Sequence, residues 1–498
     1  MRGARAKARL AGWIAFAAPL LLYAWTARRH VGFWDVGEMD TVPWILGIPH
    51  PTGFPLYVLI GWSFAHLVSI GSVALRMSLL SAAGMSVAAW LLARIVTDRT
   101  GMPWIGTICA LFFASGAIAW RDATRAEVHT LVACGVATAF FFGLRWYRTG
   151  APAALLAAAT AWGAAAAVHP VALLMLPGVL VVVVARLHRT PSRVLAAAIA
   201  LFAAAAFVPY LYLPLRSAYV VAHGLDPAQS LGLPLGSAFW NYDDPRTLGG
   251  LARLLSGSGF DVSDGLHAFF DPGTFARVAA LAWPRFVQQL GLAGIAAAAA
   301  GLLLALRRDA TETVALALCS LPCIVFAMSY GSEADPARYL LTAFIVATIF
   351  AGDALAALAR TMHEHGKAAR TALVLVAAVV LLLPAAAQRD LLAQPNDASA
   401  DATIASVVAR TAPNALLLAP WYYATPLAYA AYVRRDAGDR TVLAVWLGDV
   451  AEAVTRWLAM RPVYVVGQVV GNPPPGYRLV SIPGSPALFR IVPVRNVR

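Results

Sequence analysis

Long apolar runs, separated by short polar segments, dominate the chain up to residue 388. A helix needs about 17–25 apolar residues to cross the hydrocarbon core of a bilayer, and each backbone group is then satisfied within the helix. Runs of suitable length and composition lie at residues 11–27, 74–96, 103–120, 128–146, 151–168, 170–186, 194–214, 281–305, 312–330, 339–359 and 371–388. The pattern predicts an all-α polytopic membrane protein with about 11 transmembrane helices.

The pattern changes after residue 388. Short apolar segments at 415–420, 441–447 and 462–467 are typical of buried strands, and helical patterns lie between them. We therefore predict two domains: a transmembrane domain at 1–388, and a small extracytoplasmic α/β domain at 389–498. The tail contains no G-x-G-x-x-G turn, so nucleotide binding there is not supported.

The apolar segment 54–70 is just long enough to cross, and the basic residues decide how it is interpreted. If it does not cross and the N-terminus is cytoplasmic, most Arg residues at the ends of the runs fall inside, as the positive-inside rule requires. If it crosses, the bias reverses. We predict an interfacial helix at 54–70, with the outer loops 28–73 and 215–280 and the tail on the extracytoplasmic side.

Composition excludes several classes of protein. Of 498 residues, 60% are hydrophobic and 13% are charged, whereas a soluble protein has about 25% charged residues. The net charge of +13 comes from Arg in short loops, without a basic arm interleaved with aromatics, and does not indicate nucleic-acid binding. The lysines are Lys7 and Lys367, so no P-loop is present. The four cysteines lie in apolar runs and are interpreted as free thiols.

The first outer loop holds the strongest candidate chemistry. Asp35 and Glu38 are three residues apart, which on a helix places both on one face. One carboxylate can take a proton from an acceptor hydroxyl while the other orients it or holds a cation. The alternative is a helix start, where acidic residues are favoured by the N-terminal dipole.

Other ionisable residues near the predicted outer face are weaker candidates, because capping or headgroup contact explains them equally well. They comprise Asp122, Glu127 and His129 in the second outer loop, His50 in "IPHPTGFP", Arg216 after a span, Asp243 in "NYDDPRT" and Arg338 in "DPARY". Asp353 lies inside an apolar run, and we expect it to pair with a polar group on another helix.

Several motifs resemble those of a known family. "GFWDVGEMDTVPWILGIPHPTGFPLYVLIGWSFAHL" is similar to a block in which D-x-G-E precedes LGI-x-HP-x-G-[YF]-P-LY. "AEVHTL", "YLPLRSA", "FWNYDDPRT" and "RYLLTAFIVATIFAG" resemble later elements in the same order. The family is that of bacterial membrane proteins related to the eukaryotic protein O-mannosyltransferase acting on IPT domains, within the GT-C superfamily of glycosyltransferases. The sequence departs from its pattern at Thr52, where a second Pro is usual.

The resemblance implies the GT-C fold and a polyprenyl-phosphate sugar as donor. It implies Asp35 as the base or acceptor-orienting carboxylate, Glu38 as its partner, Glu127 with His129 and Asp122 as the second-loop group, Arg216 and Arg338 as contacts of the donor phosphate, and His50, Tyr57 and Asp243 as supporting residues. No metal is required by the spacing, although a divalent ion bridging Asp35 and Glu38 is compatible with it.

The sequence thus predicts a glycosyltransferase of a bacterial inner membrane. It would transfer a sugar, with mannose one candidate, to a hydroxyl of an acceptor protein or glycan. Two other functions remain open: a flippase or transporter for lipid-linked glycans, and a non-enzymatic envelope protein. Polar residues gather on one predicted face rather than along a pathway through the membrane, which favours the enzyme.

Overall fold

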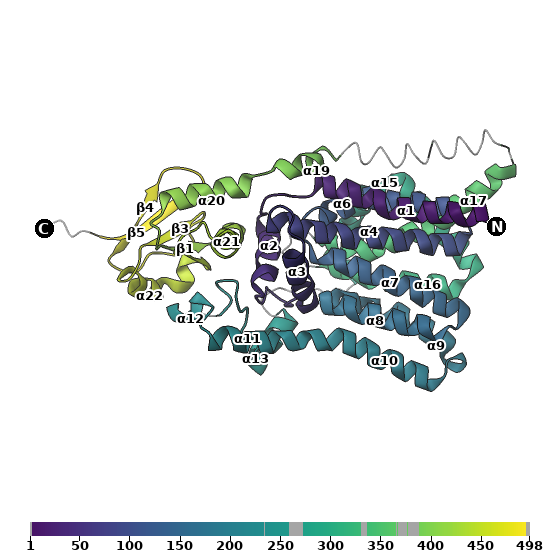
Figure 1. Ribbon diagram of the computed structural model, residues 1–498, viewed down its shortest axis with the longest axis horizontal. Coiled ribbons are helices and arrows are strands. Elements are labelled where there is room, and N and C mark those ends of the chain that lie inside the picture. Colours follow the sequence, from purple (N-terminus) through teal and green to yellow (C-terminus); the bar gives the residue numbers. More distant parts are fainter. Residues whose placement is uncertain are drawn as a thin grey trace. The chain divides into compact units, whose positions relative to one another are not determined.

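A computed structural model describes residues 2–233, 235–257, 272–329, 336–364, 366, 376 and 388–494. Its contacts divide the chain into two compact units, each built from three segments. Figure 1 labels the helices and strands that are described below. The first unit comprises Met1–Ala27, Ser81–Pro209 and Ser258–Ala393, and the second comprises Arg28–Leu80, Tyr210–Gly257 and Gln394–Arg498. The predicted division into domains at residue 388 stays a prediction.

The first unit is a bundle of helices. They are α1 (Arg2–Thr26), α4 (Val73–Thr100, whose residues before Ser81 belong to the second unit), α5 (Pro103–Ser115), α6 (Ala117–Ala123), α7 (Val128–Thr149), α8 (Pro152–Val168), α9 (Leu176–Arg186), α10 (Ser192–Phe207), α15 (Pro272–Arg308), α16 (Ala310–Ser329), α17 (Leu341–Glu364) and α19 (Arg389–Ala393). Short 3₁₀ helices are η1 (Pro170–Met175), η2 (Leu187–Arg189), η3 (Val208–Leu211, which extends into the second unit) and η4 (Pro336–Leu340). Helices α7, α8 and α10 pack in that order around Trp146, Leu155 and Ala198.

Eight of the predicted spans are helical segments long and apolar enough to cross a membrane, which makes the chain a multi-pass membrane protein. The other three differ. Helix α8 has 17 residues and lies at the lower limit of length. The predicted span 103–120 is broken into α5 and α6, which meet at an angle of 72°. The predicted span 371–388 lies almost entirely outside the described residues.

A side chain from α15 stabilises the break between α5 and α6. Gln289 Oε1 accepts hydrogen bonds from the backbone N–H groups of Ile118 and Ala119, both at 3.0 Å, and its Nε2 donates to the Phe113 carbonyl at 2.9 Å. These are the backbone groups that a broken helix leaves unsatisfied. A Cβ at Gly116 would lie 2.2 Å from Gln289 Nε2 and 2.6 Å from the Gln289 backbone oxygen, so a larger residue would force the two segments to shift. Apolar composition alone could not reveal this break.

The second unit contains the predicted polar outer segments. Its helices are α2 (Trp34–Ile45), α3 (Pro55–Leu67), α11 (Tyr212–Ala222), α12 (Pro227–Leu231), α13 (Leu248–Ser256), η5 (Gln394–Asn396), α20 (Ser399–Arg410), α21 (Trp421–Tyr429), η6 (Ala430–Arg434) and α22 (Leu447–Leu458). Helix α3 spans about 20 Å at 1.5 Å per residue, which is shorter than a hydrocarbon core of about 30 Å. This length agrees with the prediction that 54–70 does not cross, while its place relative to a bilayer stays a prediction.

Ion pairs join the first outer loop to the tail within this unit. Arg28 contacts Asp397 at 2.6 Å, and Asp401 contacts both His30 and Arg434 at 2.6 Å. Helix α2 also packs against α21 of the tail. The tail and the first outer loop, which carries Asp35, therefore pack against each other within the second unit.

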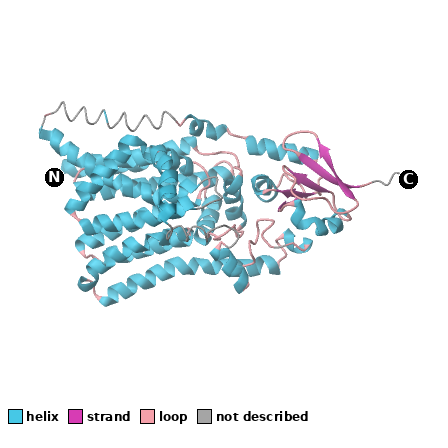
Figure 2. Ribbon diagram, turned by 180° about the vertical axis from the view of Figure 1, so that it is seen from behind, coloured by secondary structure: helices cyan, strands magenta, loops and turns pink. Residues whose placement is uncertain are grey.

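The tail forms a five-stranded sheet, drawn in magenta in Figure 2. The strands are β1 (Leu416–Ala419), β2 (Thr441–Ala444), β3 (Val463–Val466), β4 (Tyr477–Ile482) and β5 (Leu488–Pro493), in the order β2-β1-β3-β5-β4. Strand β1 pairs in parallel with β2 and β3, as the βαβ pattern predicts, and the antiparallel β4–β5 hairpin was not predicted. Helix α22 covers one face through Val450, Val454 and Trp457.

Candidate active site

Helix α2 and the loop after it bring Asp35, Glu38 and His50 together. One ligand atom from each lies within 4.8 Å of the other two. Glu38 is 1% exposed and accepts a hydrogen bond from the His50 backbone N–H at 2.9 Å, while its second oxygen contacts His50 Nδ1. A carboxylate pair and an imidazole at this spacing could hold a divalent cation. Both Glu38 oxygens contact His50, so these hydrogen bonds fix the position of Glu38 without an ion.

Asp35 is held by a residue that lies far away in the sequence. Trp421 Nε1, at the start of α21, donates to Asp35 Oδ1 at 3.1 Å. The Trp421 ring also contacts Phe239 at 5.1 Å and His50 at 6.0 Å, centroid to centroid. In the sequence, the aromatic triplet 421–423 directly follows the first predicted strand of the tail. No local signal pairs it with Asp35, since the contact depends on the tertiary fold.

Arg216 lies in α11 and contacts the C-terminal end of α2. Its Nε donates to the Leu46 carbonyl at 2.6 Å, and its Nη2 donates to the Ile45 carbonyl at 3.0 Å. Leu46 has φ of 52°, the left-handed conformation that commonly ends a helix. Arg216 therefore has a structural contact that the sequence did not predict, and its role toward a donor phosphate stays a prediction.

The predicted supporting residues Tyr57 and Asp243 lie in the second unit, as Asp35 does. Tyr57 on α3 is fully buried. Burial raises the pKa of Tyr242 to about 12, with the charges of Glu38 and Asp243 adding to the shift. Asp243 lies 3.7 Å from Arg253.

Asn241 is fully buried, and among the described residues neither polar atom of its side chain has a hydrogen-bond partner. It is a candidate ligand contact that sequence reasoning did not select.

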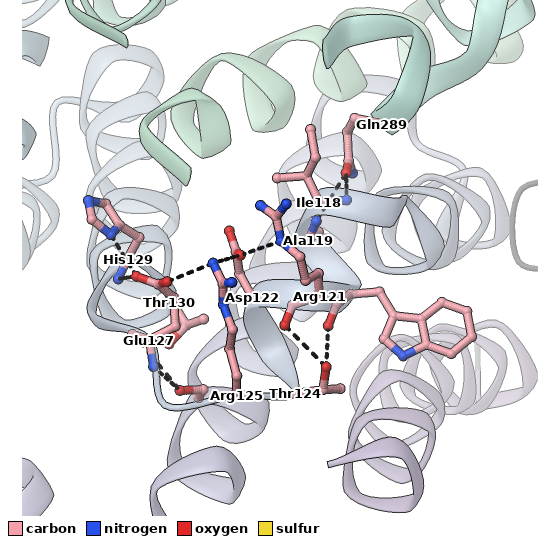
Figure 3. A network of polar contacts seen from close by, with 12 residues as sticks. Ile118, Ala119, Arg121, Asp122, Thr124, Arg125, Glu127, His129, Thr130 and Gln289 are labelled. Atoms are coloured by element: carbon pink, nitrogen blue, oxygen red, sulfur yellow. Dashed lines mark hydrogen bonds and ion pairs between the residues drawn. The ribbon is translucent and has the colours of Figure 1, made fainter. Parts of the chain in front are cut away.

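The second-loop residues form a separate network in the first unit, shown in Figure 3. Asp122, fully buried, contacts Arg125 at 2.8 Å and Arg121 at 3.2 Å. Arg125 also contacts Glu127 at 3.1 Å. Glu127 caps α7 by accepting from the backbone N–H of His129 at 3.2 Å, and it contacts His129 Nδ1 at 2.8 Å. Capping, the structural alternative to a functional role for Glu127, is therefore present, and the functional role of this group stays a prediction.

This network continues into aromatic and basic residues of other helices. The His129 ring lies 4.8 Å from His169 and 4.7 Å from Tyr339, centroid to centroid. Burial by itself raises the pKa of Glu127, but His129, Arg338 and Arg125 outweigh this and hold the pKa well below its ordinary value. Arg338 therefore acts electrostatically on Glu127, and its predicted contact with a phosphate remains untested.

Asp40 provides a prediction about stability. Burial raises the pKa of its carboxyl from 3.8 to about 7, against the opposing effects of the Gly32 N–H and of Arg28. The folded state thus holds this proton more tightly than the unfolded state, so Asp40 lowers stability as the pH rises from about 4 to about 7. At pH 8 we expect Asp40→Asn to be more stable than the wild type by on the order of 4 kcal/mol, at 1.36 kcal/mol per pKa unit.

Thermal unfolding of the detergent-solubilised chain at pH 4 and pH 8 tests this expectation. The gap between Asp40→Asn and the wild type should open only at the higher pH. The matched control is Asp439→Asn on the exposed surface, which should leave the pH dependence of unfolding unchanged. Equal stability of Asp40→Asn and the wild type at pH 8 would contradict a buried, proton-retaining Asp40.

The protein shares its overall fold with two solved membrane transferases, and the expected GT-C fold class is confirmed. ArnT from Cupriavidus metallidurans bound to undecaprenyl phosphate superposes with a TM-score of 0.54 at 14% identity, covering 97% of this chain and 98% of ArnT. The apo oligosaccharyltransferase of Archaeoglobus fulgidus gives a TM-score of 0.51 at 13% identity, covering 99% and 75% of the two chains.

The matches in sequence cover a shorter part of the chain than the matches in structure, and they name one family. Residues 35–192 match the family described as the protein O-mannosyl-transferase TMEM260 N-terminal domain. Protein O-mannosyl-transferase tmem260 of Dictyostelium discoideum is 28% identical over 134 residues, or 26% of this chain, and TMEM260 of Mus musculus is 34% identical over 116 residues, or 23% of it. The aligned region spans only 16% of either relative. The family resemblance expected from the motifs is confirmed for this region.

Proposed function

We propose that the protein is a membrane glycosyltransferase that moves a sugar, with mannose the first candidate, from a polyprenyl-phosphate donor to an acceptor hydroxyl. The reaction takes place on the extracytoplasmic side of a bacterial inner membrane. The names of the relatives, the fold shared with ArnT and the undecaprenyl phosphate bound to that ArnT support the proposal. The observation that carries it is the cluster of Asp35, Glu38 and His50, which lies within the matched region.

Asp35 is the proposed base. It takes the proton of the acceptor hydroxyl as the acceptor oxygen forms a bond to the anomeric carbon, and the bond from that carbon to the phosphate oxygen breaks. The leaving polyprenyl phosphate keeps the electron pair, so a single displacement inverts the anomeric centre. Glu38, held by His50, orients the acceptor, and a divalent cation bound by the cluster would offset charge on the leaving phosphate.

Labelled donors test the function. Purified protein in nanodiscs, supplied with radiolabelled polyprenyl-phosphate mannose and a membrane extract as acceptor source, should release polyprenyl phosphate and label an acceptor. The same assay with polyprenyl-phosphate glucose and galactose identifies the sugar. If no lipid-phosphate sugar is turned over, but the protein in sealed proteoliposomes moves labelled lipid from one leaflet to the other, the protein is a flippase and not a transferase.

His50 is a positioning residue in this proposal, and its substitution has a graded expected effect. His50→Ala removes the Nδ1 contact to Glu38 but keeps the backbone N–H bond. We expect kcat to fall about tenfold, because misplaced catalytic groups lose rate steeply, while KM for the donor stays constant. His50→Asn, which restores a donor near Nδ1, should recover part of the rate. His66→Ala, on exposed α3 surface, is the matched control. A wild-type kcat in His50→Ala would contradict this role.

A further inference from the structure

An aromatic pocket of about 540 Å³ lies beside Asp35, within the second unit. It is lined chiefly by Trp34, Trp421, Tyr422, Tyr423, Trp446 and Gln468. Its volume falls in the range of about 300–1,000 Å³ typical of small-molecule sites. Trp421 both lines the pocket and donates to Asp35, so a molecule bound here would be one side chain away from the proposed base.

The pocket lies where an open α/β sheet commonly binds its ligand. Strand β1 is flanked by β2 on one side and by β3 on the other, so the chain reverses its direction of travel across the sheet at β1. Ligands of such sheets bind at the carboxyl ends of the strands, at this switch point. The lining residues 420–423 follow β1, Trp446 follows β2, and residues 467–468 follow β3.

The backbone that carries the aromatic lining has positive φ at two positions, Trp34 and Gly467. Trp34 has φ of 55°, a conformation that bulky residues rarely adopt, and its side chain is 53% exposed at the pocket. Gly467 has φ of 79°, and a Cβ there would lie 2.5 Å from Tyr423 Cε2. Glycine at 467 therefore allows the Tyr423 ring to approach the backbone, and the strain at Trp34 is of a kind that concentrates at ligand sites.

The chemistry of the lining selects the class of ligand. None of the lining residues is charged, so the donor phosphate, which needs cationic partners, is not bound here. An extended peptide would pair with a sheet edge, whereas this pocket lies at strand ends. Exposed faces of Trp and Tyr attract the weakly positive C–H face of a pyranose, and the Gln468 amide can both donate to and accept from its hydroxyls.

We propose that this pocket is a binding subsite for one uncharged pyranose unit. The sugar belongs either to the lipid-linked donor or to a glycan already present on the acceptor. The proposal deepens the proposed function and rests on it for the sugar's role, but binding can be measured without turnover.

Binding of methyl α-D-mannopyranoside to the full chain in nanodiscs, followed by saturation-transfer difference NMR, tests the subsite. We expect saturable binding that Trp34→Ala and Trp446→Ala each weaken roughly three- to tenfold, the effect of losing one stacked ring. The matched control is Trp62→Ala on α3, because Trp62 is 38% exposed, Trp446 is 37% exposed, and Trp62 lies outside the pocket. Methyl glycosides of glucose, galactose and N-acetylglucosamine extend the panel.

Two results would overturn the subsite: no saturable binding of any of the four glycosides, or binding undiminished in both pocket variants. Hydrolysis of polyprenyl-phosphate mannose, measured as mannose released to water, distinguishes the two sources of the bound sugar, the lipid-linked donor and the acceptor glycan. Competitive inhibition by the methyl glycoside assigns the pocket to the donor sugar, and binding without inhibition assigns it to an acceptor glycan. If the protein binds sugar but turns over no lipid-linked donor, the proposed function fails and the subsite stands.

Discussion

Replacing Asp35 by Asn is expected to lower sugar transfer by about 10²- to 10⁴-fold, the usual contribution of a positioned general base. The amide has nearly the shape of the carboxylate, and its oxygen can still accept the hydrogen bond from Trp421 Nε1. The substitution therefore removes the ability to take a proton while it leaves the contact with α21 in place. Transfer of label from polyprenyl-phosphate sugar to acceptor gives kcat and KM for the comparison.

A set of carboxylate-to-amide variants makes the result specific. Asp439→Asn, on the exposed surface, should transfer sugar at the wild-type rate. Glu38→Gln should be intermediate, at roughly 10- to 100-fold loss, because the amide disturbs the contact with His50 without removing the base. Melting temperatures within a degree or two of the wild type would exclude misfolding. Undiminished transfer by folded Asp35→Asn would refute its assignment as the base.

Arg99→Met should destabilise the helical bundle by about 3–5 kcal/mol, the cost of leaving buried charges without their partner. Arg99 Nη2 lies 2.5 Å from Asp353, and Nη1 contacts Glu312. The side chains of all three are at most 4% exposed. Arg148 contacts Glu312 at 2.8 Å and Arg308 contacts Asp353 at 2.9 Å, so the cluster joins five helices. Thermal and denaturant unfolding of the solubilised protein would measure the loss.

The control for Arg99→Met lies one and a half turns earlier on the same helix. Arg94 is exposed and has rings of Trp90 and Phe141 near its guanidinium, so Arg94→Met should change stability by less than about 1 kcal/mol. Neutralising the two acidic partners together with Arg99 should recover part of the loss, because the buried carboxylate charges then disappear. Arg148 and Arg308 lose these partners too, but their side chains are 31% and 43% exposed and stay solvated. Unchanged unfolding of Arg99→Met would show that the carboxylates find other compensation.

The Arg99 cluster also shows what the sequence can predict about a single charged residue and what it cannot. Asp353 in an apolar run was expected to pair with a polar group on another helix, and it does. A charge in an apolar helix must be compensated, so the existence of a partner follows from composition. The identity of that partner does not, because Arg99 is 254 residues away.

The pattern of apolar and polar residues along the chain determined the membrane helices, the three parallel strands of the tail and the placement of Asp35 and Glu38 on one helix. These features depend on local periodicity, which any helix or strand must satisfy to bury its apolar face. The sequence pattern did not predict the break at Gly116 or the β4–β5 hairpin. The break depends on Gln289 from another helix, and strand β4 of the hairpin has no fully buried residue that would give a strong apolar signal.

The composition of the candidate site was decided by the tertiary structure. The sequence selected Asp35, Glu38 and His50 from one short loop, but it could not predict that Trp421 bonds Asp35, that Arg216 holds the end of α2, or that Trp34 and Trp446 line one pocket. Such contacts join segments separated by up to several hundred residues. They arise from packing of whole elements, and no periodicity along the chain encodes which element will meet which.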